Sequence, residues 1–244
     1  MDPKEASDRE RSKLRSEGRR IGFHHLRRWL GIRIYGIYAR PLSPPDSEPD
    51  LPGFSGRIYE ARDIEELLVL TKRPELGMPE AFVRRALAKG DVCEAVLHKG
   101  EIVSYCWMAF TPTHDSDGVY VDFGEHDRYA YKGFTLPQFR GAHLRRYYNP
   151  YTDAYCISRG ATHAVAFVDV SNHAAILSNI GMGNRRIGFA GYLKRGRLFI
   201  PFRTPAVRRR GFRFFVPPVD QSDHDLIQPT SPRLQGDCSN RRGP

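Results

Sequence analysis

The residues best suited to bind an anion lie in the segment FTLPQFRGAHL, residues 134–144. Here a strand-like run enters a turn that contains Pro137, and Gly141 stands where a helix should begin. Such a junction leaves the first backbone N–H groups of the helix unpaired and sets the positive end of its dipole beside them. The segment therefore fits a pyrophosphate group, although an ordinary tight turn has the same residue pattern.

A second strand-to-helix junction follows about thirty residues later, which is the size of one β-α-β unit. In VDVSNHAAILSNIGM, residues 168–182, a strand ends near Asn172. This asparagine opens a helix of small and aliphatic residues, and Gly181 closes it. The second junction strengthens the interpretation of the first as part of a binding site.

The two segments resemble motifs of the GNAT superfamily of N-acyltransferases, whose members bind acetyl-CoA or another acyl-CoA. The family's loop has the pattern Gln/Arg-x-x-Gly-x-Gly/Ala, which is matched by Gln138, Gly141 and, imperfectly, His143. Its later pattern Asn-x-x-Ala-x-x-Leu-Tyr-x-x-Gly-Phe is matched loosely by Asn172, Ala175, Leu177 and Gly181-Met182. In the order of its elements the resemblance extends over roughly residues 57–203.

The resemblance implies a co-substrate and a reaction. Two neighbouring parallel strands splay apart to admit the pantetheine arm, and loop amides hold the pyrophosphate. An amine attacks the thioester carbonyl directly, while a base takes its proton, a backbone N–H polarises the carbonyl and an acid can protonate the thiolate. Acyl-CoA is then the co-substrate, and neither a metal nor a covalent enzyme intermediate is needed. The cofactor-binding residues that it implies are Thr135, Leu136, Gln138, Arg140, Gly141, Ala142, His143, Leu144 and Asn172.

Three positions depart from the family's pattern. His143 stands where Gly or Ala lets phosphates approach the backbone, so its side chain must turn away or contact phosphate itself. Asn149-Pro150 interrupts the expected helix, and because an interior proline costs about 3 kcal/mol we expect a kink or a second helix beginning at Pro150. Ser178 aligns with the Tyr that usually acts as the acid, so the thiolate is expected to leave unprotonated.

The general base has no motif of its own. Glu125 and Asp127 precede a strand-like run, near the place where the family often has a carboxylate, and they are the candidate catalytic residues. The alternative is that both are solvated loop charges. Tyr129 and Tyr131 alternate on one face of that run, so they are candidates for the acceptor (substrate) pocket or, alternatively, packing residues.

Hydrophobic spacing outlines the elements that must position these residues. Two helix-like segments come first, then the strand-like runs of residues 92–98 and 101–110, which Lys99-Gly100 joins as a hairpin. After further strand-like runs the chain alternates helix, strand, helix and strands over residues 142–203. This order predicts an α+β fold, GNAT-like, with a mixed and mostly antiparallel central sheet flanked by helices.

Composition divides the chain into four parts. Residues 1–20 and 217–244 are polar and charged with few apolar residues, which predicts disordered tails. Residues 21–56 hold an Arg-rich island with interleaved aromatics, half helix-like and half strand-like, and a Pro-rich linker. The island is expected to dock on the main domain; the alternative is a basic segment on a phosphate backbone or an anionic membrane. The acyltransferase domain is then residues 57–216.

Charge, apolar runs and cysteines limit the classes of protein. The 244 residues include 38 Lys and Arg against 28 Asp and Glu, a formal net charge of +10. No apolar run approaches the roughly 18 residues that span a bilayer, and no signal-type apolar segment follows the first charged residues. The four cysteines are far apart with no CxxC, so free structural thiols in a reducing cytoplasm are expected.

These features predict a cytoplasmic acyltransferase that moves an acetyl or other acyl group from acyl-CoA to a small-molecule amine, with a homodimer as one option. A first alternative, motivated by Ser178 and His143, is a catalytically degenerate GNAT fold that binds acyl-CoA without turnover. A second is a basic protein that binds nucleic acid or an anionic membrane through the island and the arginines of residues 208–213. In the enzyme that arginine run would instead bind the 3′-phosphate of CoA or an anionic acceptor.

Overall fold

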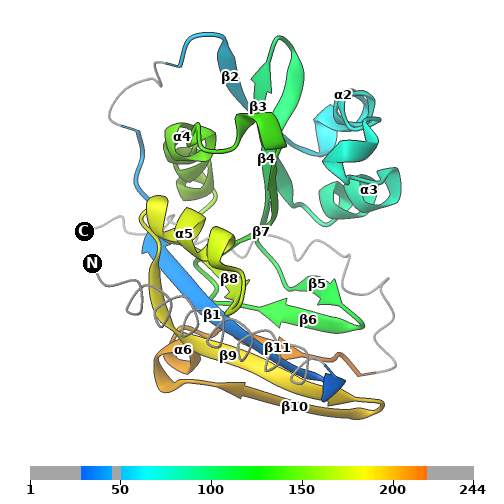
Figure 1. Cartoon of the computed structure of the whole chain (residues 1–244), viewed down its shortest axis with the longest axis vertical. Coiled ribbons are helices and arrows are strands. Elements are labelled where there is room, and N and C mark those ends of the chain that lie inside the picture. Colours follow the sequence, from blue (N-terminus) through cyan, green and yellow to red (C-terminus); the bar gives the residue numbers. More distant parts are fainter. Residues whose placement is uncertain (1–28, 46–50, 219–244) are drawn as a thin grey trace, which may run out of the picture.

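The computed structural model describes residues 29–45 and 51–218, which form a large and a small β-sheet with helices (Figure 1). In the order β10-β9-β1-β8-β7-β4-β3-β2, the large sheet comprises β10 (Leu198–Arg203), β9 (Arg185–Arg195), β1 (Ile32–Pro41), β8 (His163–Asp169), β7 (Asp127–Thr135), β4 (Glu101–Ala109), β3 (Val92–His98) and β2 (Phe54–Tyr59). The small sheet has the order β11 (Arg213–Phe215), β6 (Val119–Asp122) and β5 (Thr113–Ser116).

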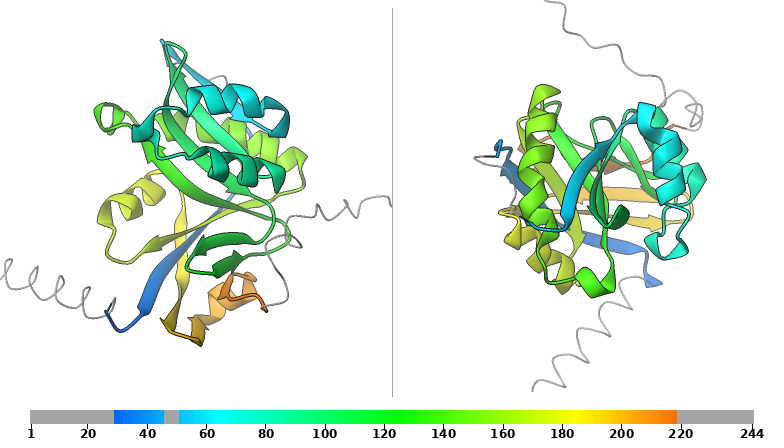
Figure 2. Two further views of the ribbon diagram at one scale, coloured as in Figure 1. Left: turned by 90° about the vertical axis from the view of Figure 1, so that its right-hand side faces the viewer. Right: turned by 90° about the horizontal axis from the view of Figure 1, so that it is seen from above.

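The helices cover the two faces of the large sheet differently. The α-helices, labelled as in Figure 1, are α2 (Ile64–Leu70), α3 (Glu80–Ala88), α4 (Leu144–Ser158), α5 (His173–Gly181) and α6 (Pro205–Arg209). Seen from above, α4 lies on one side of the sheet and α2 and α3 lie on the other (Figure 2). Every described strand pair is antiparallel except β7 with β8. The predicted α+β class with a mixed, mostly antiparallel sheet flanked by helices is therefore confirmed.

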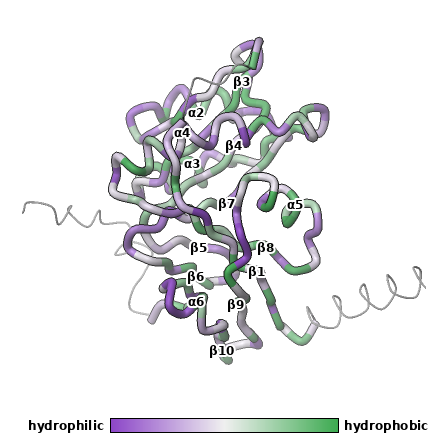
Figure 3. Tube along the Cα trace, turned by 90° about the vertical axis from the view of Figure 1, so that its left-hand side faces the viewer, coloured by the Kyte–Doolittle hydropathy of each residue, from purple (hydrophilic) through white to green (hydrophobic). Residues whose placement is uncertain are grey.

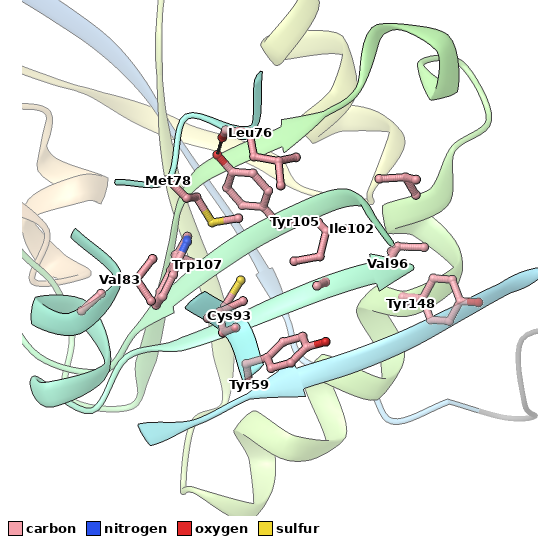
Figure 4. Packing of buried hydrophobic residues seen from close by; sticks show 14 of the residues in the cluster. Tyr59, Leu76, Met78, Val83, Cys93, Val96, Ile102, Tyr105, Trp107 and Tyr148 are labelled. Carbon is pink, nitrogen blue, oxygen red and sulfur yellow. Dashed lines mark hydrogen bonds between the residues drawn. The ribbon is translucent and has the colours of Figure 1, made fainter. Parts of the chain in front are cut away.

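Two large apolar clusters pack against the face of the sheet that is opposite α4, and the first also includes Leu144 and Tyr148 of α4 itself. The first packs α2 and α3 against β3 and β4, with Trp107 and Val83 fully buried, and the Tyr105 hydroxyl donates to the Leu76 carbonyl at 2.6 Å (Figure 4). The second packs the small sheet and α6 against β1, β8 and β9 around Phe212 and Tyr129. Between the clusters this face is left open, and that opening becomes part of the site described below.

The first described strand, β1, is an inner strand of the sheet and not a peripheral segment. Over Tyr35–Pro41 it pairs with β8, and on its other edge it pairs with β9, both antiparallel. Its β-branched and aromatic residues suit a strand, and Ile37 and Tyr38 are fully buried. The folded body thus begins before residue 57, the expected boundary, because a strand from the island fills the place between β8 and β9. The predicted tails fall on residues 1–20, outside the described residues, and on 217–244, of which only Pro217 and Pro218 are described.

Helix α4 runs as one element through Pro150, so the expected second helix beginning at this proline is not found. Proline removes a single i→i−4 hydrogen bond, here to the carbonyl of Arg146, while tertiary contacts hold both halves of the helix. The Asp153 carboxylate is buried and accepts from Arg40 Nη2 of β1 at 2.9 Å and from Arg128 Nη2 of β7 at 2.8 Å. Because loss of one partner would leave a buried charge unpaired, this cluster fixes α4 on the sheet.

The hairpin between β3 and β4 turns at Lys99 and Gly100, as predicted, and both residues have positive φ. Among the described residues no helix is long and apolar enough to cross a membrane.

Candidate active site

A groove of about 1460 Å³ opens where β7 and β8 separate. The two strands pair only at Asp127–His163, Arg128–Ala164 and Tyr129–Val165, after which both continue without pairing to each other. The backbone groups that the strands would otherwise exchange therefore face the gap. Groove-lining residues come from both faces of the sheet, so the groove passes through the gap from the α4 side to the opposite side.

A β-bulge shapes β7 at the gap. Trp107 pairs with Tyr131 and Tyr105 with Phe134, so two residues of β7, Lys132 and Gly133, oppose one residue of β4. Lys132 has a φ of 46°, an uncommon backbone conformation for a residue with a side chain. Strain of this kind at an opening between strands is typical of functional sites.

The cation nearest to this bulge comes from α4. A Cβ on Gly133 would lie 2.9 Å from Arg145 Nη1, so the guanidinium rests against the bulge. Arg145 Nε is buried without a hydrogen-bond partner, and no carboxylate among the described residues lies within ion-pair distance of this side chain. Arg145 also lines the groove, where it adds a positive charge close to the diverging strands.

The N-terminus of α4 forms one end of the groove. Gly141 and His143 both have positive φ, which turns the chain sharply before the helix. The amides of residues 141–145 donate to no carbonyl of the described residues, whereas those of Arg140 and Arg146 are bonded to Pro137 and His143. Five consecutive free amides at a helix N-terminus form a site for an anion.

The predicted cofactor-binding residues divide into two groups. Thr135, Arg140, Gly141, His143, Leu144 and Asn172 line the groove, while Leu136, Gln138 and Ala142 do not. Leu136 is buried, and its amide N–H donates to the Val103 carbonyl, with 2.9 Å between nitrogen and oxygen. Asn172 caps α5, because its side-chain oxygen accepts from the Ala175 amide at 3.1 Å. Its contact with the groove therefore comes from a side chain already engaged in the helix cap.

An aromatic row forms the floor of the groove on the other face of the sheet. Neighbouring ring centroids lie 4.7 to 6.3 Å apart along the row Tyr35, Phe167, Tyr129, Tyr131 and Phe82. These residues come from β1, β8, β7 and α3, and all five line the groove. The structure thus brings Tyr129 and Tyr131 together on one face, as the alternation predicts, and adds three rings from other elements.

Asp115 in β5 is a carboxylate whose charge acts on Tyr35 and Tyr129 of this row. It lines the groove and accepts from the Ser116 hydroxyl at 3.1 Å. Burial raises the pKa of the Asp115 carboxyl above its usual range. Burial also raises the pKa of the Tyr35 and Tyr129 phenols, and the nearby charge of Asp115 raises both further. A half-buried carboxylate with a raised pKa, facing tyrosines in a groove, has the properties of a general base.

Tyr131 is oriented by a buried ion pair. Its hydroxyl donates to Asp91 Oδ2 at 2.6 Å, and Lys89 Nζ donates to Asp91 Oδ1 at 2.6 Å. Burial, and then the Asp91 charge, raises the pKa of the Tyr131 phenol, so the phenol stays protonated. Because its proton is directed at Asp91, the lone pairs of the phenol oxygen remain for a hydrogen-bond donor in the groove.

Neither candidate for the base from the sequence lines the groove. Asp127 is buried at the start of β7, where Arg210 of the α6 region binds it through Nε at 3.1 Å and Nη2 at 2.5 Å. Glu125 is exposed in the preceding loop. No residue of the predicted basic run 208–213 lines the groove either; Phe212 is core, and Arg213 pairs with Asp122.

The described cysteines are buried and free of disulfides. Burial raises the pKa of the Cys156 thiol to about 11, which suits an inert structural thiol. In the part of the chain that the structure describes, no three His, Cys, Asp or Glu side chains form a group that could hold a metal ion.

Sequence reasoning missed Tyr35, Phe82, Phe167 and Asp115. Tyr35 enters the groove because β1 is inserted beside β8, which composition does not reveal. Asp115 belongs to the segment THDSDG, whose crowding of His, Asp and Ser was the available signal.

Comparison with protein-family models gives no match, and neither does comparison with curated proteins by sequence. Among solved structures, the chain is similar to a putative acetyltransferase from the GNAT family from Novosphingobium aromaticivorans, at 17% identity and a TM-score of 0.37, over 64% of this chain and 63% of that one. It is similar to an acetyltransferase from the GNAT family from Colwellia psychrerythraea, at 11% identity and a TM-score of 0.43, over 70% and 56% of the two chains. It is also similar to an aminoglycoside N-acetyltransferase in complex with CoA, at 13% identity and a TM-score of 0.41, over 62% and 95%. The chain spans less than two thirds of the length of the first two.

Proposed function

We propose that this protein is an acyl-CoA-dependent N-acyltransferase. The observation that carries the proposal is the separation of β7 from β8 after Tyr129 and Val165, which opens a groove between the free amides of α4 and the aromatic row. One side of this groove suits an anionic carrier, and the other suits an uncharged or cationic acceptor near a carboxylate. The sequence motifs around Gly141 and Asn172, with their resemblance to the GNAT superfamily, support the same function.

The cofactor side is chemically suited to CoA. Of the groove-lining residues, eight are Lys or Arg and three are Asp. The amides of residues 141–145 would hold the pyrophosphate, and the exposed side chains of Arg140 and Arg146 add positive charge beside them. The backbone of the diverged part of β7 would bind the amides of the pantetheine arm.

In the proposed reaction the acceptor amine lies over the aromatic row and attacks the thioester carbonyl. Asp115 takes the proton from the amine, and the Tyr131 oxygen accepts a hydrogen bond from it. A C–N bond forms as the C–S bond breaks, and the electron pair leaves on sulfur as the CoA thiolate. A backbone N–H of β7 near the bulge stabilises charge on the carbonyl oxygen.

Binding and turnover test the proposal separately. Titration calorimetry with acetyl-CoA should give a measurable heat, and ligand at about a hundred times its Kd should stabilise the fold by about 2.7 kcal/mol in a thermal-shift assay. Thiol release should then be followed over a panel of amino sugars, polyamines, arylamines and peptides.

Dephospho-CoA and free pantetheine serve as controls for the contribution of the phosphates. An absence of both heat and thermal shift with acetyl-CoA and longer acyl-CoA thioesters would refute the proposal. Binding without thiol release over the whole panel would instead favour an acyl-CoA-binding protein without turnover.

A further inference from the structure

The C-terminal part of the large sheet has an extreme charge composition. Residues 170–218 contain ten Lys and Arg and no Asp or Glu. They include α5, β9, β10, α6 and β11. Two of these arginines are neutralised by acids from elsewhere, Arg210 by Asp127 and Arg213 by Asp122. The others leave this part of the molecule strongly positive.

The same part exposes an ordered row of apolar side chains on the edge strand β10. Leu198, Ile200 and Phe202 are 52%, 53% and 41% exposed. They alternate along the strand, so they share one face of the sheet. Phe202 lies flat on that face, because a Cβ on its cross-strand partner Gly191 would be 2.6 Å from the phenyl ring. Between them, Phe199 packs toward the core on the opposite face.

The apolar row continues across the neighbouring strands. Ile200 is opposite Leu193 of β9, which is in turn opposite Ile32 of β1, and the half-buried Ile34 follows on the same face. We call Ile32, Ile34, Leu193, Leu198, Ile200 and Phe202 the β10 face. It lies on the α4 side of the sheet, because Arg40, at an even-numbered position of β1 like Ile32 and Ile34, reaches Asp153 of α4.

Arginines border this β10 face. Arg195 is directly opposite Leu198, and the guanidinium of Arg186 lies over the Phe189 ring at 4.8 Å from its centroid. Helix α5, on the same side of the sheet, adds the exposed Leu177 and Ile180. Part of this helix is coloured as hydrophobic in Figure 3. Aliphatic side chains flanked by arginines, with acids absent, are the composition of a surface that binds at the interface of an anionic bilayer.

Two other occupants fit the β10 face less well. A second copy could add to the edge strand only if β10 offered its backbone donors. The Thr204 amide donates to the Phe189 carbonyl, so its N–H points toward β9. Backbone N–H groups alternate in direction along a strand, so the positions of β10 that point away from β9 are Phe199, Pro201 and Arg203. The central position of these three is a proline, which has no N–H to offer. A nucleic acid would use the arginines but would find few rings for its bases beside Leu198 and Ile200.

We propose that the β10 face docks on an anionic lipid surface. The side chains of Leu198, Ile200 and Phe202 enter the boundary between headgroups and acyl chains, and Arg186 and Arg195 bind lipid phosphates. Since α5 contributes both to this side and to the groove wall, docking holds the groove beside the lipid surface. The proposal stands without the acyltransferase activity.

Vesicle flotation with the full chain tests this proposal. Binding is expected to vesicles of phosphatidylcholine with about one third phosphatidylserine, to weaken as salt rises, and to be weak with phosphatidylcholine alone. The variant Leu198→Ser/Ile200→Ser/Phe202→Ser should bind at least about tenfold more weakly, because it removes the inserted apolar area. The variant Arg186→Gln/Arg195→Gln should lose about thirtyfold, because it removes two charges near the lipid surface.

Matched controls lie elsewhere on the surface. Val69→Ser changes an apolar side chain that is 62% exposed on α2, and Lys72→Gln/Lys99→Gln removes two exposed charges. Both controls should float like the wild type, and circular dichroism should show every variant folded.

Three results would overturn the proposal. The first is no flotation on phosphatidylserine vesicles at low salt, and the second is wild-type flotation of the triple serine variant. The third is an absence of vesicle binding together with either retention on duplex DNA or a dimer that light scattering detects in the wild type but not in the triple serine variant. The third result would assign this surface to nucleic acid or to a second copy.

Discussion

The two sides of the groove are built by different means. On the α4 side the groups that could bind a ligand are mainly backbone amides, from five consecutive residues at one helix N-terminus and from one diverging strand. On the opposite side they are side chains, and Tyr35, Phe82, Asp115 and Tyr131 come from four separate elements. A backbone site depends on local geometry, whereas a side-chain site depends on how distant segments are assembled.

The two sides of the groove therefore differ in how well they tolerate amino-acid substitutions. Backbone amides tolerate many side chains, provided that the turn before α4 and the separation of the strands persist. The acceptor side changes when Tyr35 of β1, Asp115 of β5 or Phe82 of α3 is substituted, because each supplies a side chain to the floor or wall. We therefore expect the α4 side to determine the shared co-substrate and the other side to determine the acceptor.

The largest effect is expected from the acceptor side. Asp115→Asn should lower kcat between about a hundredfold and ten-thousandfold, because it removes the proposed base, and should leave the affinity for acyl-CoA unchanged. Since burial raises the pKa of Asp115, wild-type kcat should fall with decreasing pH at a value above that of an ordinary aspartate, near 3.9. The base works only when ionised, so this acidic limb should vanish in the variant. An arylamine acceptor with an electron-withdrawing ring substituent keeps the ionisation of the amine itself out of the measured range, because its conjugate acid is much stronger than a carboxyl group.

Asp117→Asn is the matched control for this variant. Asp117 lines the same groove two residues away but is exposed. Its kcat should stay within about twofold of the wild type. Equal losses in both variants, or an acidic limb that survives in Asp115→Asn, would remove Asp115 from the reaction and leave the acceptor side as a binding surface alone.

A smaller effect is expected when the backbone site is blocked. Gly141→Asp should weaken acetyl-CoA binding about a hundredfold, because it sets a carboxylate against the phosphates where unit charges about 4 Å apart interact by a few kcal/mol. Gly160→Asp is a close control: the two glycines have φ of 85° and 86°, and both have open space around Cβ. The backbone strain of the two substitutions is thus matched, and only Gly141 lies at the groove.

Titration calorimetry with acetyl-CoA should therefore show weaker binding for Gly141→Asp than for Gly160→Asp, although the two variants have similar thermal stability. If both bound acetyl-CoA with wild-type affinity, the phosphate site would not lie at the N-terminus of α4, and the contrast between the two sides would fail.

The same contrast explains which parts could be predicted from the sequence. The segment around Gly141 and the α5 start at Asn172 are local patterns, in which a turn residue or a cap lies next to the element it ends or begins. The α+β class follows from the order of such elements. Asp115 and Tyr35 could not be placed, because their roles arise only when β5 and β1 reach the open end of β7 and β8.

Two expectations failed or changed for a related reason. Pro150 was expected to kink a helix or to divide it in two; the division is not found, because the buried Asp153 with Arg40 and Arg128 holds α4 together across it. Local propensity thus yields to tertiary contacts. Asp127 and Glu125 lie next to the relevant strand in sequence, yet they are at the end of β7 where it still pairs with β8, away from the gap. Both residues are close in sequence to the part of β7 that lines the groove, but they lie at the end of β7 where the two strands still pair.

The smallest effect is expected at Ser178 of α5, which the sequence resemblance aligns with the usual acid of the GNAT superfamily. Ser178→Ala should change kcat by less than about twofold, because a serine hydroxyl is a poor acid and a thiol is acidic enough to leave as the thiolate, a Cys thiol having a reference pKa near 8.5. Ser178 is exposed, and no hydrogen bond of its hydroxyl is found within the described residues. Ser158→Ala, at the exposed end of α4, controls for the loss of a helix-surface hydroxyl. Steady-state thiol release measures both. A loss of tenfold or more in Ser178→Ala alone would mean that a side chain performs chemistry on the α4 side, and the two sides of the groove would then differ in degree and not in kind.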